Sequence, residues 1–369
     1  MTTWRERAQT AVRDFVTPLA DSIDRAHAVP HSVQQRLAEE GFFGLSIPTQ
    51  YGGAAASAED IAAVLEEVSF GSLSVATDLA VHLSVASAPI ARWGTAAQKE
   101  HWLPAMARGE WLGAFALTEP EVGSDSQHIQ TKYTAAGDGF RIDGSKIFIT
   151  NGGQARVVLV FATRDPKLEA RGISCFLVER GSPGFSVTRR LDKLGLRGSE
   201  TTELLFDGCR VPAGAMLGPE GKGFEVAMSA LEGGRIGISA TSLGVARAAL
   251  RVLSSHVRPS SEEWRRSVLS RAHVSVEAAS ALVLRAARLK DSGADYGLAA
   301  SSAKLFCSQV AFQVASRAYD FTVEDGADHD EVQGAERLFR DSRVLTIVEG
   351  TTEIQELILG RKLSAPARD

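Results

Sequence analysis

The sequence is poor in the residues that build disulfide frameworks and metal sites. It has three cysteines among 369 residues, and no CxxC pattern or Cys/His spacing relates Cys175, Cys209 and Cys307. This odd, dispersed set predicts neither a disulfide framework nor a zinc site, and we expect no bound metal. The acidic phrase EDGADHDE, residues 324–331, lacks the acid spacing of a calcium loop, which favours an exposed loop.

Long apolar runs and blocks of like charge are also missing. No stretch of about 18 uninterrupted apolar residues is present, which argues against a membrane span. The net charge of -5 argues against a nucleic-acid-binding surface. The opening segment MTTWRERAQTAVRDF mixes acids and bases and has no apolar centre, so we expect a native helix in a cytoplasmic protein.

The chain contains two helical regions on either side of a strand-rich one. Residues 1–112 carry apolar residues at helical spacing, and Ser57 followed by Asp60 predicts a helix start. Residues 113–215 consist of short strand-like runs, which predicts a largely antiparallel β domain. Within it, Asn151-Gly152-Gly153 separates two such runs and predicts a β-hairpin. Residues 216–369 return to long, alanine-rich helices that are typical of a bundle.

Two phrases in the β region have plain and functional interpretations. The segment LTEPEVGSDSQ, residues 117–127, places Thr118 and Ser124 on a turn where they can bind a ligand. A plain turn is the alternative, because turn formation alone accounts for most of the residue types in this segment. The segment KIFITNGG, residues 146–153, places Phe148 and Thr150 on one side of a strand and Ile149 on the other. An aromatic ring and a hydroxyl there can line a flat ligand, or simply form a half-buried strand.

A lone acid near the C-terminus is the candidate catalytic group. In TIVEGTTEIQ, Thr352 and Gln355 match a capping box, which predicts that the last helix starts near Glu353. Glu349 then lies outside the helix N-terminus, on a turn that Gly350 permits. The helix dipole favours its charge and apolar neighbours oppose it, a balance that suits a general base. A structural acid is the alternative, because ion-paired acids are common at helix starts.

Four phrases taken together resemble the acyl-CoA dehydrogenase family of flavoproteins. They are LTEPEVGSD, GSKIFITNGG, KLGLRGSETTELLFDGCRVP and VEGTTEIQ, in the family's order and spacing over nearly the whole chain. The resemblance implies an α+β fold with an N-terminal helical domain, a central antiparallel β-barrel and a C-terminal four-helix bundle that enclose FAD. It also implies that Glu349 removes the α-proton of an acyl thioester while the flavin accepts the β-hydride. The product would be a 2,3-enoyl thioester.

The same resemblance assigns binding residues by position. Flavin contacts are implied for Phe115, Leu117, Thr118, Gly123, Ser124, Phe148, Ile149, Thr150, Thr351 and Glu353. Contacts to the thioester ligand are implied for Ser124, Glu232, Arg235 and Gly350. Some family members carry their base at the position that Gly234 occupies here, which leaves Glu349 as the matching base. Without the family resemblance, a structural salt bridge is an equally good interpretation of Arg235.

The chain departs from the family pattern at the contacts expected across a dimer. The usual Arg-x-x-Phe-Gly loop is absent from the shortened segment at 254–274, where Arg258, Arg265 or Arg266 can compensate. The Gln-x-x-Gly-Gly-x-Gly stretch is replaced by TVEDGAD. The resemblance implies a homodimer or homotetramer, a substrate carried on CoA or an acyl carrier protein, and an electron-transfer flavoprotein as acceptor. The alternatives are an oxygen-using oxidase or monooxygenase on the same scaffold, and a non-catalytic partner subunit.

Overall fold

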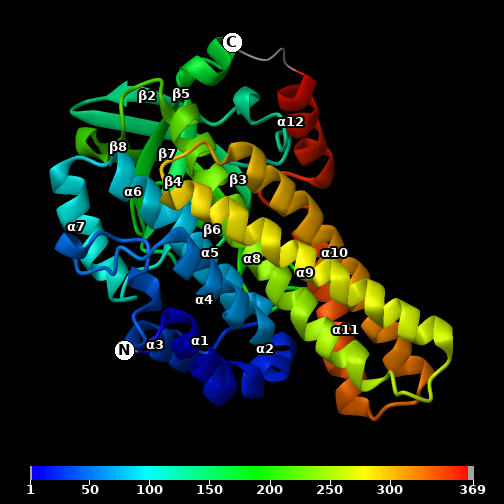
Figure 1. The fold of residues 1–369 in the computed structure, drawn as a ribbon. Helices are drawn as coiled ribbons and strands as arrows, with labels where there is room; N and C mark the ends of the chain where they lie inside the picture. The colour runs from blue at the N-terminus through cyan, green and yellow to red at the C-terminus, as the bar shows by residue number, and fades with distance from the viewer. Residues whose placement is uncertain (1, 365–369) are drawn as a thin grey trace.

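The computed structural model describes residues 2–364 and shows helical parts at both ends of the chain around a central sheet, as predicted (Figure 1). The N-terminal helices are α1 (Trp4–Ala11), α2 (Ala20–Ala26), α3 (His31–Glu39), α4 (Ala58–Gly71), α5 (Leu73–Val81), α6 (Ala88–Trp93) and α7 (Ala96–Ala107). Helix α4 begins as predicted, because the Ser57 side chain accepts a hydrogen bond from Asp60 N at 3.0 Å.

The central part is a mixed sheet that is mostly antiparallel. Its strands are β1 (Gly113–Ala116), β2 (Lys132–Ala136), β3 (Gly139–Thr150), β4 (Val157–Thr163), β5 (Ile173–Glu179), β6 (Phe185–Arg190), β7 (Thr201–Pro212) and β8 (Met216–Leu217). The strand order is β6-β7-β3-β2-β4-β5-β8, with β1 on β4. Strands β1 and β2 pair with β4 in parallel, and β2 does so through one residue pair, Lys132 and Thr163. The two halves of the sheet enclose an apolar core that includes Ile142, Val160 and Phe206.

The predicted hairpin at Asn151-Gly152-Gly153 is wrong, although the two strands beside it are correct. Strand β3 pairs with β2 and β7, whereas β4 pairs with β5 and β1. The Asn151 side-chain amide donates to Asp78 O at 3.0 Å and to Gly113 O at 3.4 Å, which ties the turn to α5 and β1. A Cβ on Gly152 would lie 2.2 Å from Thr202 Oγ1, so glycine here allows close approach to β7.

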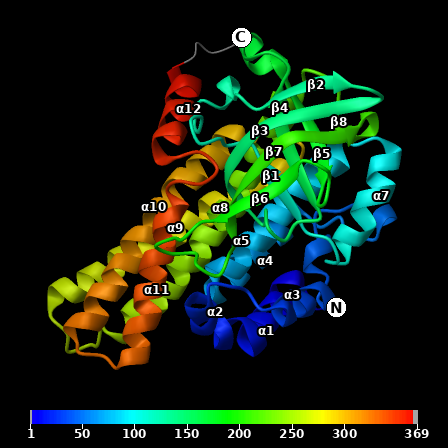
Figure 2. The same cartoon turned by 180° about the vertical axis from the view of Figure 1, so that it is seen from behind.

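The C-terminal part is a bundle of four long helices followed by a shorter one. The bundle comprises α8 (Gly223–Ser255), α9 (Glu263–Asp291), α10 (Gly297–Glu324) and α11 (His329–Leu345), and α12 (Thr352–Ser364) follows. Helix α8 is about 50 Å long at 1.5 Å per residue and lies at the centre of the protein, against α4, α9 and α10. In both views the far end of the bundle projects away from the sheet, while α12 returns towards it (Figures 1 and 2).

Two helical stretches have the length and apolar composition of membrane spans. They are Leu73–Trp93 and Gly223–Ser255, and their most apolar windows are 83% and 78% buried inside the protein. Packing within the core therefore accounts for their apolar character.

Candidate active site

The loop that follows β1 is fixed against β3 by a buried ion pair. The Lys146 ammonium donates to Leu117 O at 2.9 Å and to Glu119 Oε1 at 2.8 Å. The Glu119 carboxylate also accepts from Thr131 N at 2.9 Å, which closes the loop. Burial opposes the charge of Glu119, but Lys146 and the hydrogen bonds outweigh it and lower the pKa of this carboxyl. Sequence reasoning missed the pair because its members lie 27 positions apart.

The predicted flavin-binding residues on and near this loop differ in how far they are exposed to solvent. Leu117 is buried, and Phe115 packs on Phe161 with 4.8 Å between ring centroids. Thr118 is half-buried, whereas Gly123 and Ser124 are exposed. Ile147 N donates to Thr118 O at 2.9 Å, so the loop lies directly beside the end of β3.

The end of β3 presents an aromatic ring to the outside. Phe148 has φ +60° and is 64% exposed, while Ile149 is buried and Thr150 is half-buried. The register between β3 and β7 shifts between Lys146 and Ile149, so Lys146 and Ile149 both turn inward. The exposed ring of Phe148 on β3 and the hydroxyls of Thr150 and of the adjoining loop residues Thr118 and Ser124 suit a flat, amphipathic ring such as a flavin.

The turn between α11 and α12 holds Glu349 in an unusual backbone conformation. Glu349 has φ +53° and Gly350 φ +95°. The Gln355 side chain donates to both of their carbonyls, at 3.3 and 3.1 Å, and so fastens the turn to α12. A non-glycine residue at positive φ is sparsely populated and often marks a functional site.

The predicted capping box is displaced by one residue. Helix α12 begins at Thr352, and the hydroxyl of Thr351 accepts from Ile354 N at 3.3 Å. The Thr352 hydroxyl instead donates to Thr346 O at 3.4 Å, and the Gln355 side chain donates to the carbonyl of Gly350 in the turn. Glu353 is exposed in the first helical turn, where hydrogen bonds from its own backbone and from Thr351 lower its pKa.

The Glu349 carboxylate rests directly on α8. A Cβ at Gly234 would stand 2.2 Å from Glu349 Oε2, so only glycine leaves room for the carboxylate here. Glu349 Oε2 is enclosed and has no hydrogen-bond partner among residues 2–364. Burial raises the pKa of Glu349 to about 7, and the positive charges of Arg235 and Lys304 oppose that rise. A carboxylate with this pKa and a free oxygen can take a proton near neutral pH.

Two cations act on this carboxylate, and a second acid lies nearby on α8. Arg235 on α8 is 9% exposed and its Nε has no partner among the described residues. Burial lowers the pKa of Arg235, and Glu349 is the first of the acids that oppose the shift. Glu232 lies one turn away against the start of α10, where a Cβ on Gly297 would stand 2.1 Å from its Oε1. Lys304 on α10 is fully buried and was not predicted; a lone lysine in the apolar run AKLFCSQVAF was the available signal.

The far end of the bundle contains its own ion pairs. Arg265 donates to Glu324 at 2.9 Å and to Asp325 at 2.7 Å, and His256 Nδ1 lies 2.9 Å from Asp325. Arg266 donates to Pro259 O at 2.8 Å. Of the three arginines predicted to compensate for the missing loop, Arg265 is therefore neutralised by acids of its own chain.

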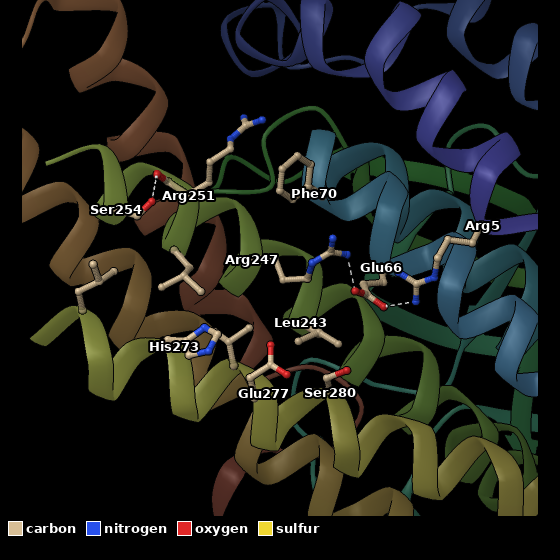
Figure 3. A pocket seen from close by; sticks show the side chains of 13 residues that line it. Arg5, Glu66, Phe70, Leu243, Arg247, Arg251, Ser254, His273, Glu277 and Ser280 are labelled. Atoms are coloured by element: carbon tan, nitrogen blue, oxygen red, sulfur yellow. Dashed lines mark hydrogen bonds and ion pairs between the residues drawn. The ribbon is translucent and has the colours of Figure 1, made fainter. Parts of the chain in front are cut away.

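A pocket of about 760 Å³ lies between α4, α8 and α9, apart from the predicted site residues (Figure 3). Figure 3 shows Arg5 and Arg247 converging on Glu66 from opposite sides. Both arginines also bind Glu67, at 2.5 and 2.9 Å. These acids and arginines satisfy each other, so they connect α1, α4 and α8. Within residues 2–364, no group of three His, Cys, Asp or Glu side chains is arranged to hold a metal ion.

Comparison with known proteins identifies the family. The N-terminal, middle and C-terminal domain models of acyl-CoA dehydrogenase match residues 2–110, 114–209 and 221–364. An acyl-CoA dehydrogenase of Bacillus subtilis is 39% identical over 95% of this chain and 96% of its own. The short-chain specific acyl-CoA dehydrogenase of Clostridium acetobutylicum is 36% identical over 98% of both. The structure of butyryl-CoA dehydrogenase from Megasphaera elsdenii superposes with a TM-score of 0.94 at 34% identity, over 98% of this chain and 97% of that one. The chain therefore belongs to the acyl-CoA dehydrogenase family of flavoproteins.

Proposed function

We propose that this protein is an FAD-dependent dehydrogenase of short-chain acyl thioesters and that Glu349 is its base. Glu349 takes a proton from the α-carbon, and the α,β C–C bond becomes a double bond as the β-carbon loses a hydride. When bound, the flavin would supply the redox chemistry of this step as the hydride acceptor. The thioester carbonyl would accept a hydrogen bond from Glu349 N–H, which stabilises the charge that develops on its oxygen.

The chain's own residues suit this cofactor and this substrate. Phe148 and the hydroxyls of Thr118, Ser124 and Thr150 would hold the ring system, with Phe115, Leu117, Ile149 and Gly123 beneath or beside them. Thr351 and Glu353 at the start of α12 would hold the part of FAD beyond the ring system. Ser124, Glu232, Arg235 and Gly350 would position the thioester ligand. The preference for a short acyl chain follows from two relatives, a short-chain specific acyl-CoA dehydrogenase and a butyryl-CoA dehydrogenase.

One observation carries the proposal: Oε2 of the half-buried Glu349 is enclosed against Gly234 without a hydrogen-bond partner, and the pKa of this carboxyl is raised to about 7. A structural acid at a helix start would be ion-paired or solvated, and Glu349 has no ion pair among the described residues. The test is anaerobic mixing of the purified yellow protein with a panel of thioesters, followed by flavin absorbance. Loss of the absorbance is expected with butyryl-CoA or a similar short thioester.

Variants at two acids distinguish the base from its surroundings. Glu349→Gln should keep the flavin and slow its reduction by about 10²- to 10⁴-fold, the usual contribution of a general base. Glu356→Gln, at an exposed acid on α12, is the control and should reduce at the wild-type rate. Wild-type reduction by Glu349→Gln would show that another group takes the proton.

The carrier, the acceptor and the assembly are further parts of the proposal. CoA and an acyl carrier protein present the same thioester, and the panel should contain both forms. We also propose an electron-transfer flavoprotein as the acceptor, a homodimer or homotetramer in solution, and a cytoplasmic location, all by family resemblance. Rapid reoxidation by oxygen without an added acceptor would favour the oxidase alternative.

A non-catalytic partner subunit is the second candidate, and one observation favours it. Arg265 is bound to Glu324 and Asp325, which leaves fewer free cations at the end of the bundle to hold the FAD pyrophosphate. The flavin content of the purified protein tests this alternative. A colourless protein that binds no added FAD would support it and exclude the dehydrogenase.

A further inference from the structure

Among residues 2–364, two lysines are fully buried, and they differ in one respect. Lys146 has two partners, Leu117 O and Glu119 Oε1. Lys304 is equally inaccessible, at 0% exposure, yet its Nζ has no hydrogen-bond partner among residues 2–364. Burying an ammonium without a partner is among the costlier arrangements in a protein interior. Such an arrangement needs a compensating reason, and functional sites are where such costs are retained.

The surroundings of Lys304 point to Glu349 as that reason. Helix α10 packs against both α8 and α12, which flank the turn that carries Glu349. The charged groups that act on Lys304 are Glu349 from the turn, Arg235 from α8 and Glu353 from α12, with Glu349 the strongest of them. None of them comes within 4.0 Å to form an ion pair with it.

Other buried polar atoms on α10 and α12 are also unpaired. Ser301 Oγ, one turn earlier on α10, and Gln355 Oε1, on α12, have no partner among the described residues. Glu349 Oε2 completes this set of free oxygens. The ammonium is therefore acted on by the charge of the proposed base and forms no hydrogen bond or ion pair with its carboxylate.

A cation at this separation has a specific electrostatic consequence. A direct ion pair would hold the carboxylate tightly and weaken it as a base. An apolar residue at 304 would leave only Arg235 to oppose the burial of the Glu349 charge. A buried ammonium held further away favours the ionised carboxylate while both of its oxygens remain free to meet a substrate carbon.

We propose that Lys304 is a positioning residue for the Glu349 base, whose buried and unpaired ammonium favours the ionised form of that carboxylate without pairing with it. This inference rests on the proposed function of Glu349. Lys304 touches neither the substrate nor the flavin in this role and acts only through the base. Its cost to folding and its benefit to the base are separate quantities, and each can be measured.

The first test concerns stability and needs no flavin or substrate. Burial lowers the pKa of Lys304 to about 8, so the fold disfavours the charged form, and the cost is complete below about pH 8. Lys304→Met should therefore raise the melting temperature of the full chain at pH 7, and the gain should shrink as the pH approaches 10.5. Lys146→Met is the matched control and should lower the melting temperature, because it leaves the Glu119 carboxylate buried without its cation. A lower melting temperature for Lys304→Met would show a structural lysine and overturn the proposal.

The second test follows the protonation of Glu349 directly. The carboxyl infrared band that Glu349→Gln removes is titrated in wild type, Lys304→Met and Lys304→Gln. We expect the midpoint to move upward by about one pH value in both variants, whichever neutral side chain is present. An unmoved midpoint would overturn the proposal even if the wild type reduced no thioester, which separates this failure from failure of the proposed function.

The third test uses the rate of flavin reduction where the wild type is active. Lys304→Met should slow reduction about tenfold at pH 6 and recover the wild-type rate near pH 9, where Glu349 is ionised in both proteins. A loss that is uniform from pH 6 to pH 9 would indicate distortion of the site and would overturn the electrostatic role.

Discussion

Replacing Gly234 with alanine tests whether the Glu349 carboxylate rests on α8. The added Cβ would stand 2.2 Å from Oε2 and 2.8 Å from Cδ of Glu349, whereas real Cβ contacts essentially never fall below 3.0 Å. The carboxylate oxygen must therefore retreat by about 0.8 Å or more. A displacement of about 1 Å can cost on the order of 10²-fold in rate, so we expect Gly234→Ala to slow flavin reduction by that factor.

The fold should survive this change, because alanine suits a helix better than glycine. In a helix interior the exchange stabilises by about 1 kcal/mol, which offsets part of the crowding. Gly233→Ala is the matched control in the same helical turn. Its Cβ would meet Lys290 Nζ at 3.3 Å and Tyr296 Oη at 3.9 Å, both at the ends of flexible side chains. We expect it to gain up to about 1 kcal/mol in stability and to keep its limiting rate within about threefold of wild type.

The assay is anaerobic stopped-flow measurement of flavin absorbance at saturating thioester, with thermal unfolding of the same samples. Saturation removes any effect of Gly233 or Gly234 on substrate binding from the comparison. If Gly234→Ala and Gly233→Ala reduced at the same rate, the carboxylate would not depend on this contact. The assignment of Gly234 as its support would then be wrong.

Four further predictions concern the buried charges. The rate constant for flavin reduction should rise with pH through an apparent pKa near 7 and level off above about pH 8, because burial raises the pKa of Glu349 to about 7. Since the fold disfavours the ionised form, Glu349→Gln should be more stable than wild type above pH 7 by up to about 3 kcal/mol, and equally stable below about pH 4; a denaturant titration at both pH values measures this. Glu119→Gln should cost about 3 kcal/mol and weaken flavin retention in gel filtration, because it leaves Lys146 buried without a counter-charge. Arg247→Met should cost about 2 kcal/mol in urea unfolding with an unchanged rate of flavin reduction, because Glu66 and Glu67 keep only Arg5.

Local sequence signals predicted the features that depend on neighbouring residues. The order of helical, strand-rich and helical segments follows from the period of the apolar residues, and Ser57 caps its helix as expected. The position of Glu349 just before the N-terminus of the last helix was also predictable, because Gly350 and the following threonines indicate a turn and a helix start. The cap itself lies at Thr351 and not at Thr352, since Thr352 and Gln355 have partners in the preceding turn that sequence spacing does not show.

Long-range pairing was beyond the reach of the sequence. Asn151-Gly152-Gly153 indicates a turn, and a turn is present, but the signal does not say which strands pair on either side of it. The deciding contacts are remote: Asn151 binds Asp78 and Gly113, and Gly152 makes room for Thr202. A hairpin signal thus predicts local backbone shape and does not by itself predict strand register.

The two buried lysines show the same limit for side chains. Strand alternation would place Lys146 on the face of Phe148, yet a register shift turns it inward to meet Glu119. Lys304 lies on a helix that is apolar on most of its faces, where a lysine is expected to reach solvent. Its burial becomes apparent only when α8, α10 and α12 are packed together.

The proposed base therefore depends on three segments that are distant in the sequence. The turn after α11 provides the carboxylate, α8 provides the glycine beneath it and the cation at 235, and α10 provides the cation at 304. Since one shift of α8 would change both the support and the charge around Glu349, helix packing and base strength are coupled in this protein. Substitutions between α8 and α10 that leave the protein folded should consequently change the pH dependence of flavin reduction, in addition to its rate.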